Sequence, residues 1–344
     1  MTQATTDRKN DHIHINLHED VSFNRLTTGL EHYRFVHQAL PNLDLDAIST
    51  ETTFLEKQLS FPLIISSMTG GSDHAAEINR TLAQAAQEAG IGMGLGSMRA
   101  AVERPETAWT YQMRDCAPDI LLLANLGAVQ LNYGYGPQAC RQMVERVDAD
   151  ALILHLNPLQ EALQPEGDTC FGDLLSQIAA TCEALDVPVV VKEVGWGLSK
   201  EAAQALIEVG VAALDIAGAG GTSWSQVEMY RSKTDVQREV AAAFRDWGIP
   251  TAESIQLVRQ VSTSIPLIAS GGLCDGIDIA KALALGANVG AIARPLLHSA
   301  SNSPETLRQH LTILRHQFRI TMFAAGARDI ETLRATQLIA ASAR

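Results

Sequence analysis

The sequence is poor in aromatic and in basic residues. Only 5% of its 344 residues are aromatic, and 26 Lys and Arg face 39 Asp and Glu, which gives a formal net charge of −13. A surface that binds a polyanion needs a basic excess, so nucleic acid is not an expected partner. An anionic small substrate would have to be held by a few local Lys, Arg or backbone N–H groups.

Cysteine pairs and long apolar runs are also missing. The five cysteines form no CxxC pair, which favours a reducing compartment over a disulfide framework. The segment Met1–Leu17 is polar and has no apolar signal core. No apolar run reaches the ~18 residues of a membrane span. We therefore expect a soluble, cytoplasmic protein that does not enter a membrane.

Short apolar runs bounded by Gly, Pro or Asp predict eight strands. Most are continuously apolar, as parallel strands buried on both faces are, whereas the glycine-rich second one is a weak strand former. They are Pro62–Ser67, Gly92–Gly96, Ile120–Asn125, Ala151–Asn157, Pro188–Glu193, Ala213–Ala217, Pro266–Ser270 and Val289–Ala293.

Helical patterns lie between these strands. Several end at a glycine that suits a helix C-cap, namely Gly90, Gly210 and Gly286. Eightfold strand–helix alternation favours an α/β fold of the TIM (β/α)8-barrel type, which needs ~250 residues, over an open doubly wound sheet. The expected helices are Asp73–Ala89, Gly136–Val147, Phe171–Leu185, Lys200–Val209, Ala252–Val261 and Asp275–Leu285.

No sharp linker divides the chain, so we expect one barrel domain over residues 62–344 with an N-terminal extension over residues 1–61. The end of the chain, Ser303–Ala341, predicts one or two amphipathic helices that pack on the barrel or on a neighbouring subunit, with Leu307, Leu311, Leu314 and Phe318 on one face. The stretch Gly218–Pro250 is longer than usual loops and follows the sixth strand. It is a candidate lid over the barrel mouth; a packing excursion or a subunit contact is the alternative.

Two segments stand out at the last two strands: the glycine-rich Ile268–Gly276 and the strand end Ala291–Pro295. Glycine lets backbone N–H groups approach an anion, and many barrels hold a phosphate in these two loops. The pattern does not choose between flavin and nucleotide barrels, and two tight turns without a ligand are the alternative. At the end of the first strand, Ser66–Gly71 could hydrogen-bond the edge of a flat heterocycle, or could simply lead into a helix capped near Ser72.

Polar residues also leave the fourth and fifth strands. His155 and Asn157 are two apart and so project to one face, with Gln160 and Glu161 following at the rim. Together they predict a polar substrate site with a Mg²⁺ ligand, although one carboxylate is a weak site unless substrate phosphate oxygens complete it. A buried Lys192 must be paired, for example with the adjacent glutamate, or must stabilise negative charge on a reduced flavin.

At this point the motifs resemble those of type II isopentenyl-diphosphate delta-isomerase, in order and over most of the barrel. The His-Leu-Asn-Pro-Leu-Gln-Glu string is the most specific of them. The matching segments are Arg8-Lys9 with His12, Met68–Gly71, Gly96–Arg99, His155–Glu161, Val191–Val194 and Gly220–Thr222.

The resemblance implies an FMN site, a diphosphate site and a homo-oligomer, either a tetramer or an octamer. Substrate would be held by Arg8, Lys9, His12, Ser97, Met98, Arg99 and Gln160, with His155, Asn157 and Gln160 in catalytic roles and Glu161 on Mg²⁺. FMN would be held by Ser66, Ser67, Met68, Thr69, Ser97, Asn125, Lys192, Thr222, Gly271, Gly272, Leu273, Ala293 and Arg294. Cys274 stands where an arginine is frequent, and Arg294 where a glycine is, so the phosphate grip departs from the pattern.

The implied reaction moves a double bond by a 1,3-proton shift without net redox change. A reduced flavin offers an N5 proton and an electron-rich face, so we hypothesise that reduced FMN is the acid–base catalyst and that NADPH or NADH only reduces it. Full turnover with a 5-deaza-FMN enzyme would contradict this role.

Three other functions fit the sequence less well. An α-hydroxyacid oxidase needs a His–Arg pair near strands six and seven, where Gly220–Trp224 offers no histidine. An IMP dehydrogenase-like barrel needs a catalytic cysteine in Gly218–Pro250, which contains none. A flavin store or scaffold would not need the polar His155–Glu161 string. Such a protein would lose nothing measurable on Gln160→Ala or Glu161→Ala.

Overall fold

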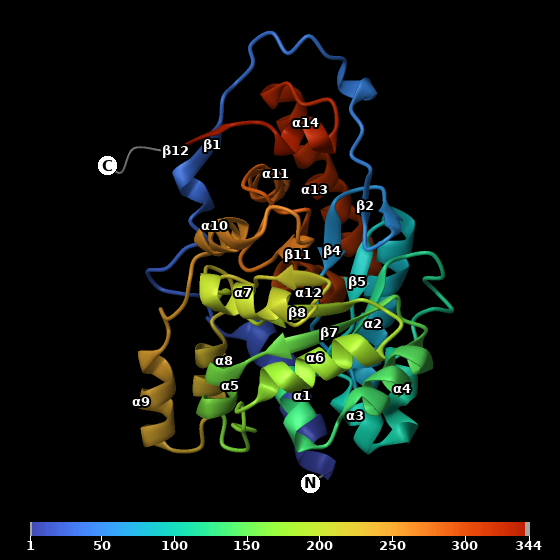
Figure 1. Cartoon of the computed structure of the whole chain (residues 1–344), viewed down its shortest axis with the longest axis vertical. Coiled ribbons are helices and arrows are strands. Elements are labelled where there is room, and N and C mark those ends of the chain that lie inside the picture. Colours follow the sequence, from blue (N-terminus) through green and yellow to red (C-terminus); the bar gives the residue numbers. More distant parts are fainter. Residues whose placement is uncertain (1, 341–344) are drawn as a thin grey trace.

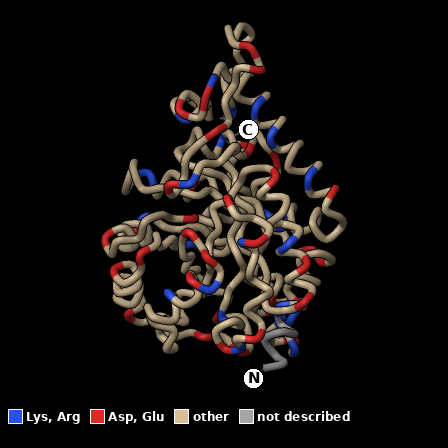
Figure 2. The backbone as a smooth tube through the Cα atoms, turned by 90° about the vertical axis from the view of Figure 1, so that its right-hand side faces the viewer, with Lys and Arg blue, Asp and Glu red and all other residues tan. Residues whose placement is uncertain are grey.

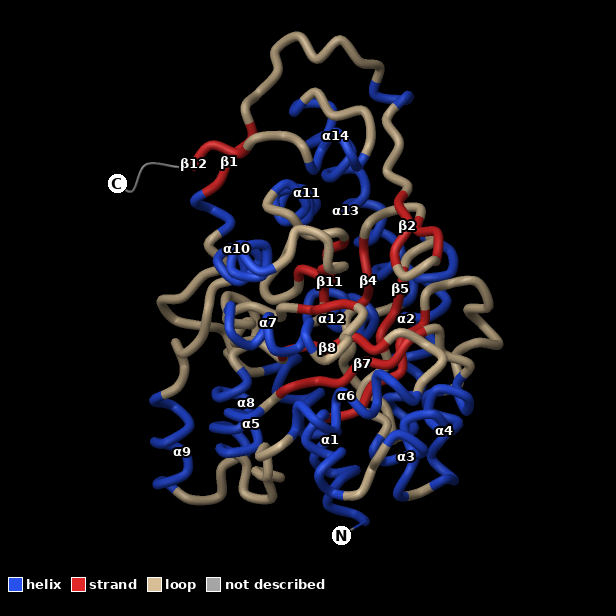
Figure 3. Tube along the Cα trace, in the orientation of Figure 1, coloured by secondary structure: helices blue, strands red, loops and turns tan. Residues whose placement is uncertain are grey.

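Eight parallel strands close into a barrel, as the sequence predicted (Figures 1 and 3). The computed structural model describes the backbone of residues 2–340 and the side chains of residues 9–340. The strand order around the barrel follows the chain, and its last strand pairs with its first. The strands are β4 (Leu63–Ile65), β5 (Gly92–Gly94), β6 (Leu122–Gly127), β7 (Ala151–Leu156), β8 (Val189–Glu193), β9 (Ala213–Asp215), β10 (Leu267–Ala269) and β11 (Val289–Ile292).

Helices surround the barrel, and all six that the sequence predicted are present within three residues of their expected bounds. Those six are α2 (Asp73–Ala89), α4 (Pro137–Val147), α6 (Leu174–Ala184), α7 (Lys200–Glu208), α10 (Thr251–Val261) and α11 (Gly276–Ala284). Further helices are α3 (Arg99–Glu103), α5 (Pro158–Leu163) and α12 (Arg294–Asn302), with 3-10 turns at Leu30–His32, Leu45–Ala47, Pro105–Tyr111 and Ala128–Tyr133.

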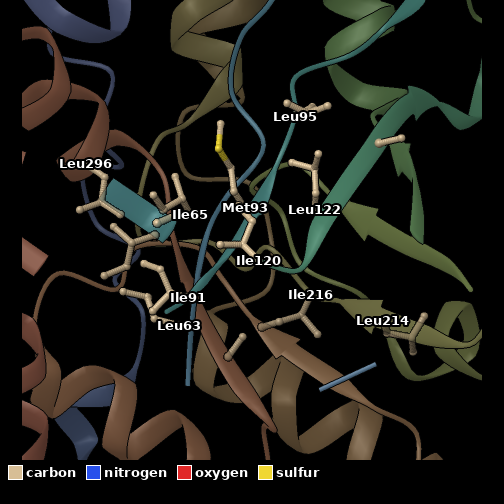
Figure 4. Close-up of a cluster of buried hydrophobic side chains, with 14 of the residues drawn as sticks. Leu63, Ile65, Ile91, Met93, Leu95, Ile120, Leu122, Leu214, Ile216 and Leu296 are labelled. Atoms are coloured by element: carbon tan, nitrogen blue, oxygen red, sulfur yellow. The ribbon is translucent and has the colours of Figure 1, made fainter. Parts of the chain in front are cut away.

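Side chains alternate along each strand between two apolar clusters. Leu63 and Ile65 face outward to the helices, where Figure 4 shows them beside Met93 and Leu122. Ile64 between them faces the barrel interior. This alternation decides which positions reach the barrel mouth, because the inward face of each strand continues beyond its last apolar residue.

A short hairpin, which the sequence did not predict, closes the end of the barrel that lies opposite the carboxyl ends of its strands. It consists of β2 (Thr52–Phe54) and β3 (Lys57–Leu59), paired antiparallel. Phe54 and Leu59 are buried against the interior cluster, and Lys57 makes a 2.8 Å ion pair with Asp150. The interior is therefore sealed at this end, and only the mouth at the strands' carboxyl ends is open to a ligand.

The N-terminal extension and the C-terminal region pack on the barrel, and one strand of the extension pairs with one strand of the C-terminal region. The N-terminal extension begins with helix α1 (Thr2–His18), and its strand β1 (Tyr33–Phe35) pairs antiparallel with β12 (Leu338–Ala340). The C-terminal region forms α13 (Pro304–Ala325) and α14 (Ile330–Arg334), where one or two amphipathic helices were predicted. The four side chains predicted on one face of this region are all buried: Leu307, Leu311, Leu314 and Phe318.

Replacing Phe318 with alanine is expected to destabilise the fold by about 3–5 kcal/mol, because the side chain is fully buried and its loss leaves a cavity. Its ring packs edge-to-face on Phe61 at 5.1 Å between centroids. Urea unfolding of both proteins measures the change. Ile320→Ala on the same helix is the control, since Ile320 is 53% exposed and should cost under 1 kcal/mol. Equal losses in the two variants would contradict the placement of α13.

Charged residues of both signs are interspersed along the outer helices and loops (Figure 2). Within residues 2–340, no helix is long and apolar enough to cross a membrane.

Candidate active site

A cavity of about 540 Å³ lies at the carboxyl ends of the barrel strands. It is lined by residues of all eight strand ends, by helix α1, and by the start of the insertion Gly218–Pro250. Strand alternation explains its polar wall. Ile153 is inside the barrel, and the next two inward positions of the same strand end are His155 and Asn157.

Most residues that the sequence singled out meet in this cavity. They are Lys9, His12, Ser66, Ser67, Met68, Thr69, Ser97, Arg99, Asn125, His155, Asn157, Gln160, Glu161, Lys192, Thr222, Gly271, Gly272, Leu273, Ala293 and Arg294. Met98 does not line it, because its side chain is fully buried in the core while its N–H donates to the Asn125 carbonyl. The side chain of Arg8 lies outside the described residues.

The insertion contains helices α8 (Trp224–Arg231) and α9 (Asp235–Ala243). Helix α8 packs against α5 and α1, so the insertion and the N-terminal helix together cover the mouth of the barrel.

His155 has a defined orientation at the end of β7. Its Nδ1 lies 2.8 Å from Asn125 Oδ1, and Asn125 Nδ2 donates to the Leu95 carbonyl at 3.0 Å. Because the amide nitrogen is occupied by that carbonyl, the amide oxygen must accept, and Nδ1 of His155 carries the proton of this bond. The other ring nitrogen of His155, Nε2, lies next to Gly127, and both residues line the cavity.

A ring of amides and carboxylates surrounds Glu161 on α5. Asn157 Nδ2 donates to Glu161 Oε1 at 2.9 Å, and Glu161 Oε2 accepts from the Asp168 N–H at 2.7 Å and from the Gln164 amide. The side chain of Glu161 is 8% exposed. No group of three His, Cys, Asp or Glu that could hold a metal ion occurs among residues 9–340, so any cation here would rest on one carboxylate and on its ligand's oxygens.

Glu228 is a central residue that sequence reasoning missed. It lies on α8 and is 1% exposed, with Oε1 at 3.1 Å from both His12 Nε2 and Gln160 Nε2, and Oε2 at 2.5 Å from Arg231 Nη1. Burial alone would raise the pKa of this carboxyl, but its bonds to His12, Arg231 and Gln160 outweigh burial and lower the pKa to about 2. A charged Glu228 thus joins the N-terminal helix, the insertion and α5.

Lys192 is buried in a polar chain across three strand ends. Its Nζ lies 3.6 Å from Asp215 Oδ2 and donates to the Glu193 carbonyl at 2.7 Å, and Asp215 Oδ1 accepts from Ser270 Oγ at 2.6 Å. The expected alternative, an ion pair with a neighbouring carboxylate, is confirmed, but the partner is Asp215 and not Glu193. The Glu193 carboxylate accepts from the N–H groups of the following turn, at residues 194–196, while burial raises its pKa to about 7.

The glycine-rich loops after β9 and β10 pack backbone on backbone. Gly271 and Gly272 have φ angles of +100° and +79°, and a Cβ on Gly271 would lie 2.0 Å from the Gly218 carbonyl oxygen. A Cβ on Gly272 would lie 2.6 Å from the Gly220 carbonyl carbon. Glycine is thus required at both positions, and the loops form a cradle that brings backbone groups to the cavity wall.

Four buried polar atoms of the cavity wall have no hydrogen-bond partner among the described residues. They are Ser67 Oγ, Thr69 Oγ1, Gln130 Oε1 and Asn157 Oδ1. An unsatisfied buried polar group costs about 1–3 kcal/mol, so their grouping on one cavity indicates a polar ligand. Ser67 and Thr69 lie on the first strand end, where the sequence predicted contact with a heterocycle.

Two cations line the cavity near the ends of the first and second barrel strands, although the chain is acidic overall. Lys9 Nζ donates to the Ser97 carbonyl at 2.8 Å and to the Tyr111 hydroxyl at 2.5 Å. Arg99 pairs with Glu103 at 2.7 Å and with Asp168 at 2.5 Å. A local group of cations of this kind is what an anionic small substrate requires.

The fold and this cavity define the class of protein. A family model described as FMN-dependent dehydrogenase matches residues 2–117 and 160–340. Two solved structures of mandelate oxidase are similar in fold: a variant with an FMN monooxide adduct (TM-score 0.68, 17% identity, 97% of this chain and 99% of that chain) and the enzyme with (S)-2-phenylpropionate (TM-score 0.67, 17% identity, 98% of each). The chain is an FMN-dependent barrel enzyme.

The sequence comparison is more specific. The isopentenyl-diphosphate delta-isomerase of Rickettsia felis is 53% identical over 327 residues, which cover 95% of this chain and 94% of that protein. The enzyme of the same name from Synechococcus sp. is 55% identical over 327 residues, with the same coverage. The chain belongs to the family of FMN-dependent isopentenyl-diphosphate delta-isomerases, as its motifs indicated.

Proposed function

We propose that this enzyme interconverts isopentenyl diphosphate and dimethylallyl diphosphate with reduced FMN, Mg²⁺ and NADPH or NADH as the flavin reductant, in isoprenoid biosynthesis. The observation that carries the proposal is the composition of one cavity. The same cavity is lined by a glycine cradle, by unsatisfied hydroxyls, by the polar string from His155 to Glu161 and by the cations Lys9 and Arg99.

The residues present fit FMN. The phosphate would lie on the cradle of Gly271, Gly272 and Leu273 with the Ala293–Arg294 backbone, and the ring would meet the hydroxyls of Ser67 and Thr69. Bound and reduced, FMN would supply an N5 proton and an electron-rich ring face. The remaining assigned contacts are Ser66, Met68, Ser97, Asn125, Lys192 and Thr222.

Lys192 has a defined part in this proposal. Its ammonium group is buried and paired with Asp215, which keeps a positive charge in a site that is 7% exposed. A cation held there would favour negative charge on the reduced ring.

The diphosphate would bind at the cation side. Lys9 and Arg99 would contact phosphate oxygens, together with Arg8, His12 and the Ser97–Met98 segment, and Glu161 would hold a Mg²⁺ that the diphosphate completes. This assignment makes the extension over residues 1–61 part of the substrate site, because Lys9 and His12 on α1 line the same cavity as the barrel residues. It also makes the insertion Gly218–Pro250 a roof over the bound substrate.

The catalytic work of the side chains would be positioning in a closed pocket. A hydrogen bond to Asn125 fixes the ring of His155, and a hydrogen bond to Glu228 fixes the amide of Gln160. With fixed orientations, both side chains would hold the hydrocarbon and its reacting carbons in place. Asn157 has an unsatisfied Oδ1 that faces the same space.

The proposal extends to the setting of the enzyme. All five cysteines are unpaired, which supports a reducing, cytoplasmic compartment. A homo-oligomer, tetramer or octamer, is supported by exposed apolar side chains on and beside α9, where Val236, Val240 and Trp247 are 75%, 50% and 61% exposed. Size-exclusion chromatography with light scattering tests the oligomer.

The deciding experiment is anaerobic turnover of isopentenyl diphosphate with FMN, Mg²⁺ and NADPH, each omitted in turn. We expect dimethylallyl diphosphate only when the flavin is present and reduced. A protein that binds FMN but forms no such product, and instead oxidises mandelate or lactate, would contradict the proposed reaction while leaving the cofactor in place.

A further inference from the structure

Helix α1 contributes four residues to the cavity although little of it is anchored by apolar contacts. Lys9, His12, Ile13 and Asn16 line the cavity, and Ile13 and Ile15 are the buried apolar side chains of the helix within residues 9–18. Two small clusters therefore have to hold the helix across the mouth. Polar contacts at its carboxyl end must supply much of the remaining attachment.

Arg294 makes three such contacts from the barrel side. Its guanidinium donates to the Asn16 carbonyl at 3.0 Å, to the Glu19 carbonyl at 3.2 Å and to Ser22 Oγ at 3.4 Å. The last carbonyls of a helix lack partners within the helix and carry partial negative charge, so a cation there both caps the helix and complements its dipole. The three acceptors lie more than 270 residues away in the sequence.

These contacts form part of the cavity wall itself. Arg294, Asn16 and Ser22 all line the cavity, next to the glycine cradle. Thr222, at the start of the insertion, joins the same seam through a bridge to Ser22 and a 3.5 Å bond from its hydroxyl to Asn16 Oδ1. The wall at this end exists only while the N-terminal segment lies against the start of α12.

We propose that Arg294 is a positioning residue that couples occupancy of the cofactor cradle to the placement of the N-terminal helix. A phosphate on the cradle would hold the first turn of α12 and the loop at Thr222 in place, and Arg294 would transmit this order to the end of α1. Lys9 and His12 would then be in position for substrate only in the flavin-loaded enzyme. The inference rests on the FMN site proposed above.

Arg245 offers a matched control. It also holds this segment, through a 3.0 Å bond from Nε to the Ser22 carbonyl and a 2.7 Å ion pair with Asp20. It is not among the residues that line the cavity. Arg245→Met thus removes another tether of the same segment without touching the cradle.

The test is amide hydrogen exchange over residues 9–22 of the full chain, with and without saturating FMN. In the wild type we expect FMN to slow exchange in this segment by about tenfold or more, as three ordered hydrogen bonds to a charged group would. Arg294→Met should bind FMN and lose this FMN-dependent protection, whereas Arg245→Met should keep it. In turnover, Arg294→Met should raise the KM for isopentenyl diphosphate by about tenfold and change kcat less.

Arg294→Lys keeps the charge without the forked donors and should restore only part of the protection. FMN-dependent protection in Arg294→Met equal to that of the wild type would overturn the inference. So would a wild type that binds FMN without any change in exchange, and the proposed function would then still stand. A wild type that does not bind FMN at all would instead remove the proposed function.

Discussion

Glu228→Gln is expected to lower turnover by about 10²-fold or more while FMN binding stays unchanged. The buried carboxylate holds Gln160 and His12 from one oxygen, and both line the cavity on the side assigned to substrate. Glutamine has the same size but no charge and only one acceptor oxygen, so it cannot serve Arg231 on one side and both His12 and Gln160 on the other. Steady-state kinetics and FMN fluorescence titration measure the two properties.

The expected loss is in kcat, with KM changed by only a few fold, because misplaced positioning groups weaken the transition state more than ground-state binding. Asp11→Asn is the control: Asp11 is the other carboxylate near Arg231, at 3.9 Å, but its side chain is 58% exposed. Unchanged kcat in Glu228→Gln, or an equal loss in Asp11→Asn, would show that Glu228 does not position the site.

The same carboxylate predicts a specific acid sensitivity. Its pKa is lowered in the folded protein from 4.5 to about 2, so its charge stabilises the fold above about pH 4.5, and this contribution is lost as the pH falls through about 2. A shift of this size corresponds to roughly 3 kcal/mol. The difference in free energy of unfolding between wild type and Glu228→Gln should therefore shrink as the pH is lowered across this window, and a constant difference would contradict it.

The barrel could be predicted because its strands are encoded locally. Each strand is a short apolar run that is buried on both faces, and the polar residues two positions beyond the last inward apolar residue reach the mouth, as Ile153, His155 and Asn157 do. Helix α2 has the bounds that were expected, since Ser72 caps its start and Gly90, in a left-handed conformation, ends it.

The features that could not be predicted depend on distant partners. The hairpin Thr52–Leu59 is short and each of its strands has a single apolar side chain, so nothing in the sequence shows that it closes the barrel. Glu228 resembles any helix carboxylate with an arginine at i+3, and its importance comes from partners 68 and 216 positions away. Met98 lies inside a motif that contacts the cavity, yet its side chain turns to the core because the motif also begins α3.

Glu161→Gln is expected to abolish the dependence of turnover on Mg²⁺ and to lower turnover by about 10²–10³-fold. Among the described residues no group of three His, Cys, Asp or Glu that could hold a metal ion occurs, so the cation would depend on Glu161 and on the diphosphate. Glutamine keeps the shape, and its one amide oxygen can still accept from Asn157 Nδ2. The variant lacks the negative charge that attracts the cation and the second acceptor oxygen used by the Asp168 N–H and the Gln164 amide. A Mg²⁺ titration of the initial rate at fixed isopentenyl diphosphate measures the loss.

Glu166→Gln is the matched control, because this carboxylate lies five residues further along the same segment and is exposed. It should leave the midpoint of the Mg²⁺ titration unchanged. FMN binding should be normal in both variants, since Glu161 faces the side of the cavity away from the glycine cradle. If Glu161→Gln kept the wild-type midpoint and lost only rate, the carboxylate would act by holding Asn157 and the Asp168 N–H in place. The cation would then be bound by the diphosphate alone, and the metal assignment of Glu161 would be wrong.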